Sequence, residues 1–276
     1  MNKKSVTRGD TMRKYIVTLM VLLSLLVVSA SAHSLWVEAK DTVDAGEPLN
    51  VYSFFGHTAS STGIYVPLMD ATYLVDPDGQ RQNLTMQTGD WLPGFGWMEY
   101  AFADVVPNLS GDYVFAAVRS PGVYDPAWHG APSNPMLSAS VAKSIIHVGD
   151  EQKGSWNAGF PLEITTEQAP YDIEAMENVT FVVKYNDQPV NATYSASYWT
   201  WDAHSDENVQ AGVASEDGEF TVNFSQGGLW LVSASYLIPG AGEWTATYDS
   251  ADHYKVGDVV PYGSARYTST LSVWVR

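Results

Sequence analysis

Short runs of β-branched and aromatic residues recur along the chain about every ten to fifteen residues, and this pattern most constrains the fold. Gly, Pro, Asn and Asp separate the runs, as expected for strands joined by tight turns. No segment after residue 32 has the apolar period of about 3.6 residues that marks a helix. We therefore expect an all-β fold with little helix. The predicted strands are 49–55, 71–75, 97–102, 112–118, 179–185, 193–199, 219–224, 229–236 and 266–275.

The length of the chain predicts two domains of ordinary size. Residues 33–150 and 151–276 are each long enough to bury a core, and we expect each to form an immunoglobulin-like antiparallel β-sandwich. The polar stretch 149–154 has a glycine at each end and is the expected linker. Tight turns are predicted at 76–79 and 216–218, where a glycine can supply the positive φ.

The first 32 residues have the three parts of a secretory signal. Basic residues within 3–14 precede an apolar run over 15–28 and a small-x-small site at Ala30-Ser31-Ala32. We expect 1–32 to be a signal peptide or, if it is not cleaved, a signal anchor. The remainder of the chain would then lie outside the cytoplasm, in a periplasmic, pseudoperiplasmic or cell-surface location, and would contact the membrane only through this segment.

Composition narrows the classes of partner. The formal net charge of −17 repels nucleic acid and anionic lipid and attracts cations. With no cysteine, the chain has neither disulfides nor thiolate metal ligands, so its stability must come from its cores. Asn-x-Ser/Thr sequons indicate glycosylation of an exposed surface. They lie at Asn83, Asn108, Asn178, Asn191 and Asn223.

A candidate metal site begins at His33, which cleavage after Ala32 would make the N-terminus. A terminal histidine offers its α-amine and imidazole Nδ1 to one ion, and the resulting nitrogen-rich geometry suits Ni(II) or Cu(II). His57 follows the strand 49–55 and is the expected second ligand, with His129 as a third candidate. The alternative is that the terminal histidine is an accident of the cleavage site. Of the other histidines, we expect His147 to be a structural residue on an edge strand, and His204 and His253 to be solvated.

The motifs of common enzyme classes are absent. The chain has no Gly-x-Ser-x-Gly elbow, no His-Glu-x-x-His pair, no phosphate-binding glycine loop and no cysteine nucleophile. We therefore predict a binding protein and not an enzyme. The one enzymatic alternative is a copper-dependent polysaccharide oxygenase, which also uses an N-terminal histidine and a second histidine on a β-sandwich.

Several segments resemble a known family. Residues 32–38, 56–57 and 75–79 are similar to the first half of exported proteins encoded beside nickel and cobalt uptake transporters. That family is largely described as a domain of unknown function, and it includes the additional periplasmic component of energy-coupling-factor nickel transporters. Motifs at 187–192 and 215–220 resemble those of carboxypeptidase-regulatory-like modules.

The resemblance implies metal capture, and it carries over to His33 and His57 only. Thr58 stands where family members often have proline, and 137–142 lacks a histidine that is often found there. We predict an extracytoplasmic accessory protein that captures Ni(II) or Co(II) and presents it to a membrane transporter. The alternatives are a cell-surface structural or adhesive glycoprotein, and a copper-binding protein that uses the same terminal histidine for Cu(II).

Overall fold

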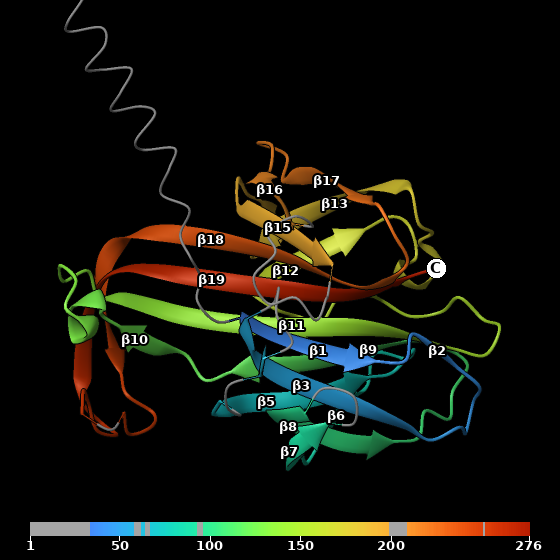
Figure 1. The fold of residues 1–276 in the computed structure, drawn as a ribbon, viewed down its shortest axis with the longest axis horizontal. Helices are drawn as coiled ribbons and strands as arrows, with labels where there is room; N and C mark the ends of the chain where they lie inside the picture. The colour runs from blue at the N-terminus through green and yellow to red at the C-terminus, as the bar shows by residue number, and fades with distance from the viewer. Residues whose placement is uncertain (1–33, 58–61, 64–66, 93–95, 199–208, 251) are drawn as a thin grey trace, which may run out of the picture. The chain divides into compact units, whose positions relative to one another are not determined.

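Strands dominate the part of the chain that the computed structural model describes (Figure 1). The only helices among these residues are two short 3-10 turns, η1 (Pro126–His129) and η2 (Pro170–Asp172), so the predicted all-β fold is confirmed. None of the helices in this part is long and apolar enough to cross a membrane. Residues 33–276 form one compact unit. The described residues are 34–57, 62–63, 67–92, 96–198, 209–250 and 252–276, without the side chains of 57, 62–63, 91–92, 96–98 and 129.

The strands form three sheets, which we call A, B and C. Sheet A has the order β1 (Ser34–Ala39), β3 (Leu49–His57), β8 (Gly96–Val105) and β7 (Gln87–Leu92), with β4 (Thr62–Gly63) beside β3. Sheet C joins β12 (Leu162–Thr166), β13 (Glu177–Tyr185), β14 (Gln188–Pro189) and β17 (Glu219–Phe224).

Sheet B is the largest sheet and links the two halves of the sequence. Its order is β16 (Val209–Val213), β15 (Thr193–Tyr198), β18 (Gly228–Thr245), β19 (Val259–Val275), β11 (Met136–Val148), β9 (Gly111–Arg119), β5 (Met69–Val75) and β6 (Arg81–Asn83). The short strands β10 (Gly122–Tyr124) and β2 (Thr42–Val43) also pair with β11. Paired strands are antiparallel except that β11 runs parallel to β19 and to β2.

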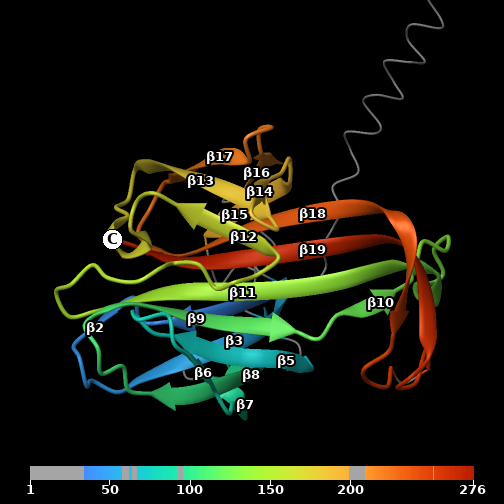
Figure 2. The same ribbon diagram turned by 180° about the vertical axis from the view of Figure 1, so that it is seen from behind.

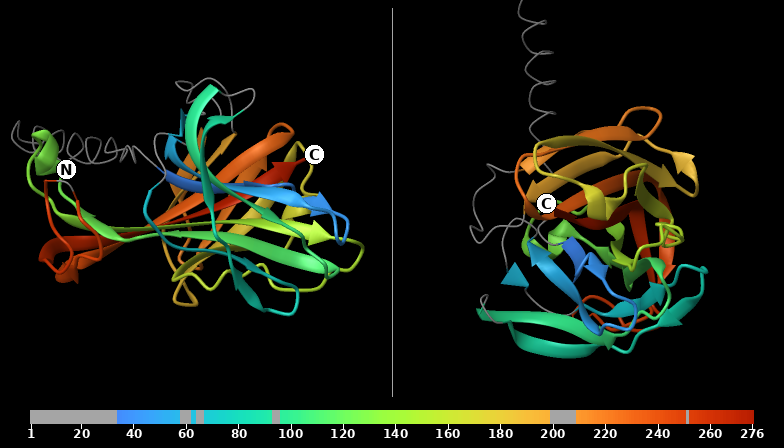
Figure 3. Two further views of the ribbon diagram at one scale, coloured as in Figure 1. Left: turned by 90° about the horizontal axis from the view of Figure 1, so that it is seen from below. Right: turned by 90° about the vertical axis from the view of Figure 1, so that its right-hand side faces the viewer.

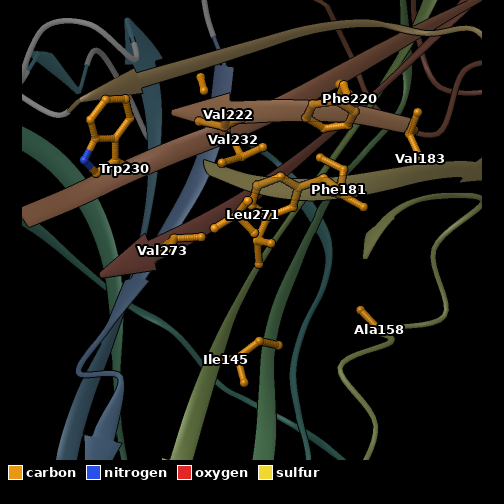
Figure 4. Packing of buried hydrophobic residues seen from close by; sticks show 14 of the residues in the cluster. Ile145, Ala158, Phe181, Val183, Phe220, Val222, Trp230, Val232, Leu271 and Val273 are labelled. Atoms are coloured by element: carbon orange, nitrogen blue, oxygen red, sulfur yellow. The ribbon is translucent and has the colours of Figure 1, made fainter. Parts of the chain in front are cut away.

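Sheet B lies between the other two sheets and buries both of its faces. Ala142 and Ile146 of β11 belong to the core shared with sheet A, and Val141 and Ile145 belong to the core shared with sheet C. Figures 1 and 2 show β18, β19 and β11 side by side, with strands of sheets A and C on opposite sides. Figure 4 shows the sheet C core, in which Ile145 lies below side chains of β13, β17, β18 and β19.

The boundary predicted at residue 150 falls between two strongly connected segments. Before it, β11 pairs with β19 from the second half over nine residue pairs that begin at Met136 and end at Ser144. After it, the expected linker is fastened to β9, because Asp112 N donates to Lys153 O over 2.6 Å. The two halves therefore share a sheet, and their division into two sandwich domains, 33–150 and 151–276, stays a prediction.

Both tight turns have the backbone conformation that the sequence predicts. Gly79 has φ 79° and Gly218 has φ 74°, a region that favours glycine. At Gly218 a Cβ atom would also lie 2.3 Å from the carbonyl oxygen of Val183. These glycines let β5 and β17 begin or end in register with their partners.

Candidate functional site

At one end of sheet A, β1 begins at Ser34, the residue after the predicted ligand His33, and β3 ends at His57, the second predicted ligand. Ser34 pairs with Gly56, and Leu35 pairs with Phe55, in antiparallel register. Ser34 and Gly56 are the chain neighbours of the two histidines. His33 itself lies outside the described residues, and for His57 only the backbone is described, as the last residue of β3.

Alternation fixes the two faces of this strand pair. Leu35 of β1 and Phe55 of β3 are buried in the core between sheets A and B. Trp36 and Phe54 lie on the other face, where their rings stack with centroids 5.2 Å apart. Because side chains alternate along a strand, these contacts assign each residue of the paired segments to one of the two faces, as far as Ser34 in β1 and Gly56 in β3.

His129 belongs to a different part of the fold. It ends η1, whose first turn is capped by the carboxylate of Asp125, which accepts from Ala127 N over 3.0 Å. Figure 3 shows η1 and β10 at the outer end of the β18–β19 hairpin, apart from β1 and β3. The side chain of His129 is not among those described, and its segment is not brought beside the strands that carry the other two ligands.

The remaining histidines have distinct surroundings. His253 is exposed but stacks on Trp128, with ring centroids 3.7 Å apart. His204 lies outside the described residues. His147 has structural contacts, but the prediction of an edge strand is wrong, because His147 pairs with Thr42 on one side and with Asp112 on the other.

His147 belongs to a polar cluster that we define as Asp112, His147, Trp156 and Tyr171. The carboxylate of Asp112 is buried and bonds His147 Nδ1 over 2.7 Å, Trp156 Nε1 over 2.8 Å and the Tyr171 hydroxyl over 3.2 Å. The Tyr171 ring stacks on His147 at 4.4 Å. Burial, aided by the charge of Asp112, raises the pKa of Tyr171 to about 12, so its hydroxyl remains a donor at neutral pH.

A buried ion pair lies beside this cluster. Lys143 Nζ contacts Glu163 Oε2 at 2.5 Å and donates to Trp156 O over 2.8 Å. Glu163 Oε1 accepts from the backbone N–H groups of Ala158 and Phe160 over 2.9 and 2.8 Å. Burial lowers the pKa of Lys143, and the Glu163 carboxylate opposes that effect. Because both side chains are almost fully buried, we interpret the pair as structural.

A groove of about 730 Å³ lies where the ends of β1, β3 and β19 meet. It is lined by residues 38–42, Asn50, Tyr52 and 274–276. Its wall contains two acids, Glu38 and Asp41, and Glu38 Oε1 accepts from Trp36 Nε1 over 2.9 Å. Burial raises the pKa of Glu38 to about 7, and the Trp36 bond opposes this only in part.

The described side chains do not gather into a metal site by themselves. Among them, no group of three or more His, Cys, Asp or Glu residues could hold a metal ion.

A family model matches most of the chain. The model for the domain of unknown function DUF4198 covers residues 30–238. The chain belongs to the DUF4198 family. This confirms the resemblance predicted from the sequence at the level of a family of unknown function. No curated protein matches the chain.

The DUF4198 match extends from just before β1 into β18 and therefore contains the positions of His33, His57 and His129. It also contains the whole polar cluster and the Lys143–Glu163 pair. The match covers only part of the groove lining: Glu38 and Tyr52 lie inside the DUF4198 match, and Trp274 lies beyond it.

Sequence reasoning did not identify the groove or the polar cluster in this DUF4198 protein. Part of the groove could have been predicted from the sequence. Residues two apart in a strand have side chains on the same face, so alternation places Trp36 and Glu38 together. No such signal existed for Asp112, whose partners lie 35, 44 and 59 residues away in the sequence.

Proposed function

We propose that this DUF4198 protein captures Ni(II) or Co(II) outside the cytoplasm through His33 and His57 and presents the ion to an uptake transporter. The observation that carries the proposal is the pairing of Ser34 with Gly56. One further step in the same antiparallel register would place residue 33 opposite residue 57. Residues directly opposite in such a pair have side chains on the same face, so both imidazoles could reach one ion.

The chemistry of this donor set favours late first-row divalent ions. Processing after Ala32 would free the His33 α-amine, which together with its imidazole Nδ1 chelates the ion, and His57 would add a second imidazole. Such nitrogen ligands suit tetragonal Ni(II) and Cu(II), and they bind only when deprotonated. A compact unit that begins at His33 is consistent with this processing. The metal is cargo, and its capture and release make no covalent bond.

The charge of the protein would assist capture without providing ligands. A formal net charge of −17 raises the local concentration of cations, and salt screens this effect over about 10 Å at 0.1 M. His129 would contribute least to affinity, because η1 lies at the outer end of the β18–β19 hairpin (Figure 3).

Blocking the α-amine is expected to weaken Ni(II) binding by about 100-fold or more, because loss of a direct ligand exceeds the roughly 10–100-fold effect of second-shell changes. The test compares the processed chain, which begins at His33, with a form whose His33 α-amine is acetylated. Acetylation retains the imidazole but converts the amine to an amide and adds no new amine. Isothermal titration with Ni(II), Co(II) and Cu(II) measures the affinities.

His33→Ala and His57→Ala are expected to weaken binding in the same assay, whereas His253→Ala, an exposed control, should bind as the parent does. Equal Ni(II) affinity of the processed and acetylated forms would overturn the proposal. A secreted protein whose N-terminal sequence begins elsewhere than His33 would also overturn it. A preference for Cu(II) beyond the usual order of divalent affinities would favour a copper carrier.

The accessibility of the sequons supports a second candidate, a cell-surface structural or adhesive glycoprotein. Asn83, Asn108, Asn178 and Asn191 are exposed, as a glycan acceptor must be. Mass spectrometry of the secreted protein tests this candidate, which requires glycans on these residues together with the absence of metal binding.

A further inference from the structure

The groove at the ends of β1, β3 and β19 has walls that are fixed by side chains from sheet B. Trp274 Nε1 donates to Ala39 O over 2.8 Å, and Ser272 Oγ donates to Val37 O. These bonds satisfy carbonyl groups along the free edge of β1 and hold β19 beside it. The groove therefore lies where two sheets pack together, and the segment 40–42 after β1 completes its wall.

One side of the groove presents aromatic rings. Trp274 is 36% exposed, although its indole N–H is already used. Tyr52 is partly buried, and its ring lies 6.1 Å from that of Phe54 and 6.4 Å from that of Phe102. The ring faces of Tyr52 and Trp274 are therefore rigidly supported parts of the wall.

The charges in the groove leave one acid without a cation. Lys40 is paired with Glu47 at 3.6 Å, and Arg276 is paired with Asp41 at 3.6 Å. Glu38, in contrast, contacts no basic side chain within the part of the chain that the structure describes; its bond is to Trp36. A partly buried carboxyl group thus lies beside aromatic faces with no charge to balance it.

We propose that this groove binds an organic cation with a substituted ammonium group, held by the Glu38 carboxylate and by the rings of Tyr52 and Trp274. Aromatic faces attract ammonium groups most strongly when water is partly excluded. A neutral ligand would leave the Glu38 charge unbalanced, and an anion would be repelled by it. The inference does not depend on metal capture at His33.

Proton release is expected to accompany binding. Burial raises the pKa of Glu38 to about 7, and a bound cation favours the ionised form. The affinity should therefore rise about tenfold between pH 6 and pH 8, following the ionised fraction of this group. The other titratable groups that line the groove are Lys40, Asp41, Tyr52 and Arg276.

Choline and its neutral isostere 3,3-dimethyl-1-butanol are the probes for this proposal. Titration of the processed chain is expected to show choline binding at least about tenfold more tightly than the alcohol, since the two differ only in charge. Glu38→Gln should lower choline affinity at least about tenfold and remove its pH dependence. Glu219→Gln removes the same charge from an exposed site on sheet C and should change neither.

Urea unfolding separates loss of the site from loss of the fold. In the folded protein Glu38 binds a proton more tightly than in the unfolded chain, so its burial costs stability as pH rises from about 4.5 to about 7. Glu38→Gln should therefore be at least as stable as the parent at pH 8. The proposal fails if the alcohol binds as tightly as choline, if neither binds, or if Glu38→Gln retains the affinity. His33→Ala should bind choline normally, so failure of metal capture is distinguishable.

Discussion

Replacement of Lys143 by alanine is expected to lower the free energy of unfolding by about 3–5 kcal/mol, because it leaves the carboxylate of Glu163 buried without its cation. Lys143 Nζ lies 2.5 Å from Glu163 Oε2, and the two side chains are only 1% and 7% exposed. Lys143 also connects β11 to the segment before β12, because its Nζ donates to Trp156 O. Urea denaturation at neutral pH measures the loss.

A double variant and an exposed pair provide the controls for Lys143. Replacing both partners, as Lys143→Met with Glu163→Gln, should cost less than Lys143→Ala alone, since no uncompensated charge remains. Lys153→Ala removes a cation at the same distance, 2.5 Å, from Asp78, but both of those side chains are about half exposed. That change should cost far less than Lys143→Ala, because solvent screens an exposed pair. A loss below about 1 kcal/mol for Lys143→Ala would show that the buried pair is not structural.

Individual strands were predictable from local patterns, whereas their assembly was not. The run 219–224 is β17 in the structure, with Phe220 and Phe224 buried and Thr221 exposed, as a period of two requires. In β19, however, the polar residues Thr270 and Ser272 are also buried, at 1% and 2% exposure. β1 lies against them, and Ser272 donates to Val37 O. A sequence pattern cannot show which distant strand covers a polar face.

The sequence could not show that β11 pairs in parallel with β19 and so joins the two halves of the chain in one sheet. A tight turn predicts an antiparallel pair of consecutive strands such as β5 and β6, but Met136 and Ser264 are paired across more than a hundred residues. The stretch 149–154 resembles a linker in the sequence because it is polar and has a glycine at each end. Its fixed contact with β9 depends on an acceptor, Lys153 O, that carries no sequence signal.

The candidate sites differ in how far the sequence could define them. The pairing of Ser34 with Gly56 depends on local features, namely the glycine near the end of β3 and the short connection between β1 and β3. The face of β1 on which Glu38 lies follows from the alternation of side chains along a strand, but the pKa of Glu38 depends on burial by β3 and β19. Side chains that meet only after three sheets assemble, such as those around Asp112, require the structure.

Asp112→Ala is expected to lower the free energy of unfolding by about 3 kcal/mol, because it removes the acceptor of three partly or fully buried donors. His147, Trp156 and Tyr171 each bond this carboxylate, over 2.7 to 3.2 Å. Two of these donors belong to the chain after residue 150, so the loss should be concentrated there. Hydrogen exchange measured by mass spectrometry should show faster exchange in 153–173 than in sheet A, alongside the shift in the urea midpoint.

The matched control for Asp112 is Asp172→Ala, one residue after Tyr171. Asp172 is 55% exposed and lies 3.9 Å from Arg276, so its removal should change stability by less than about 1 kcal/mol. If Asp112→Ala unfolds at the same urea concentration as Asp172→Ala, the three donors find other acceptors and the polar cluster does not hold the segment. If exchange instead accelerates equally in all three sheets, the carboxylate stabilises the whole unit, and 153–173 does not open separately from the shared sheet.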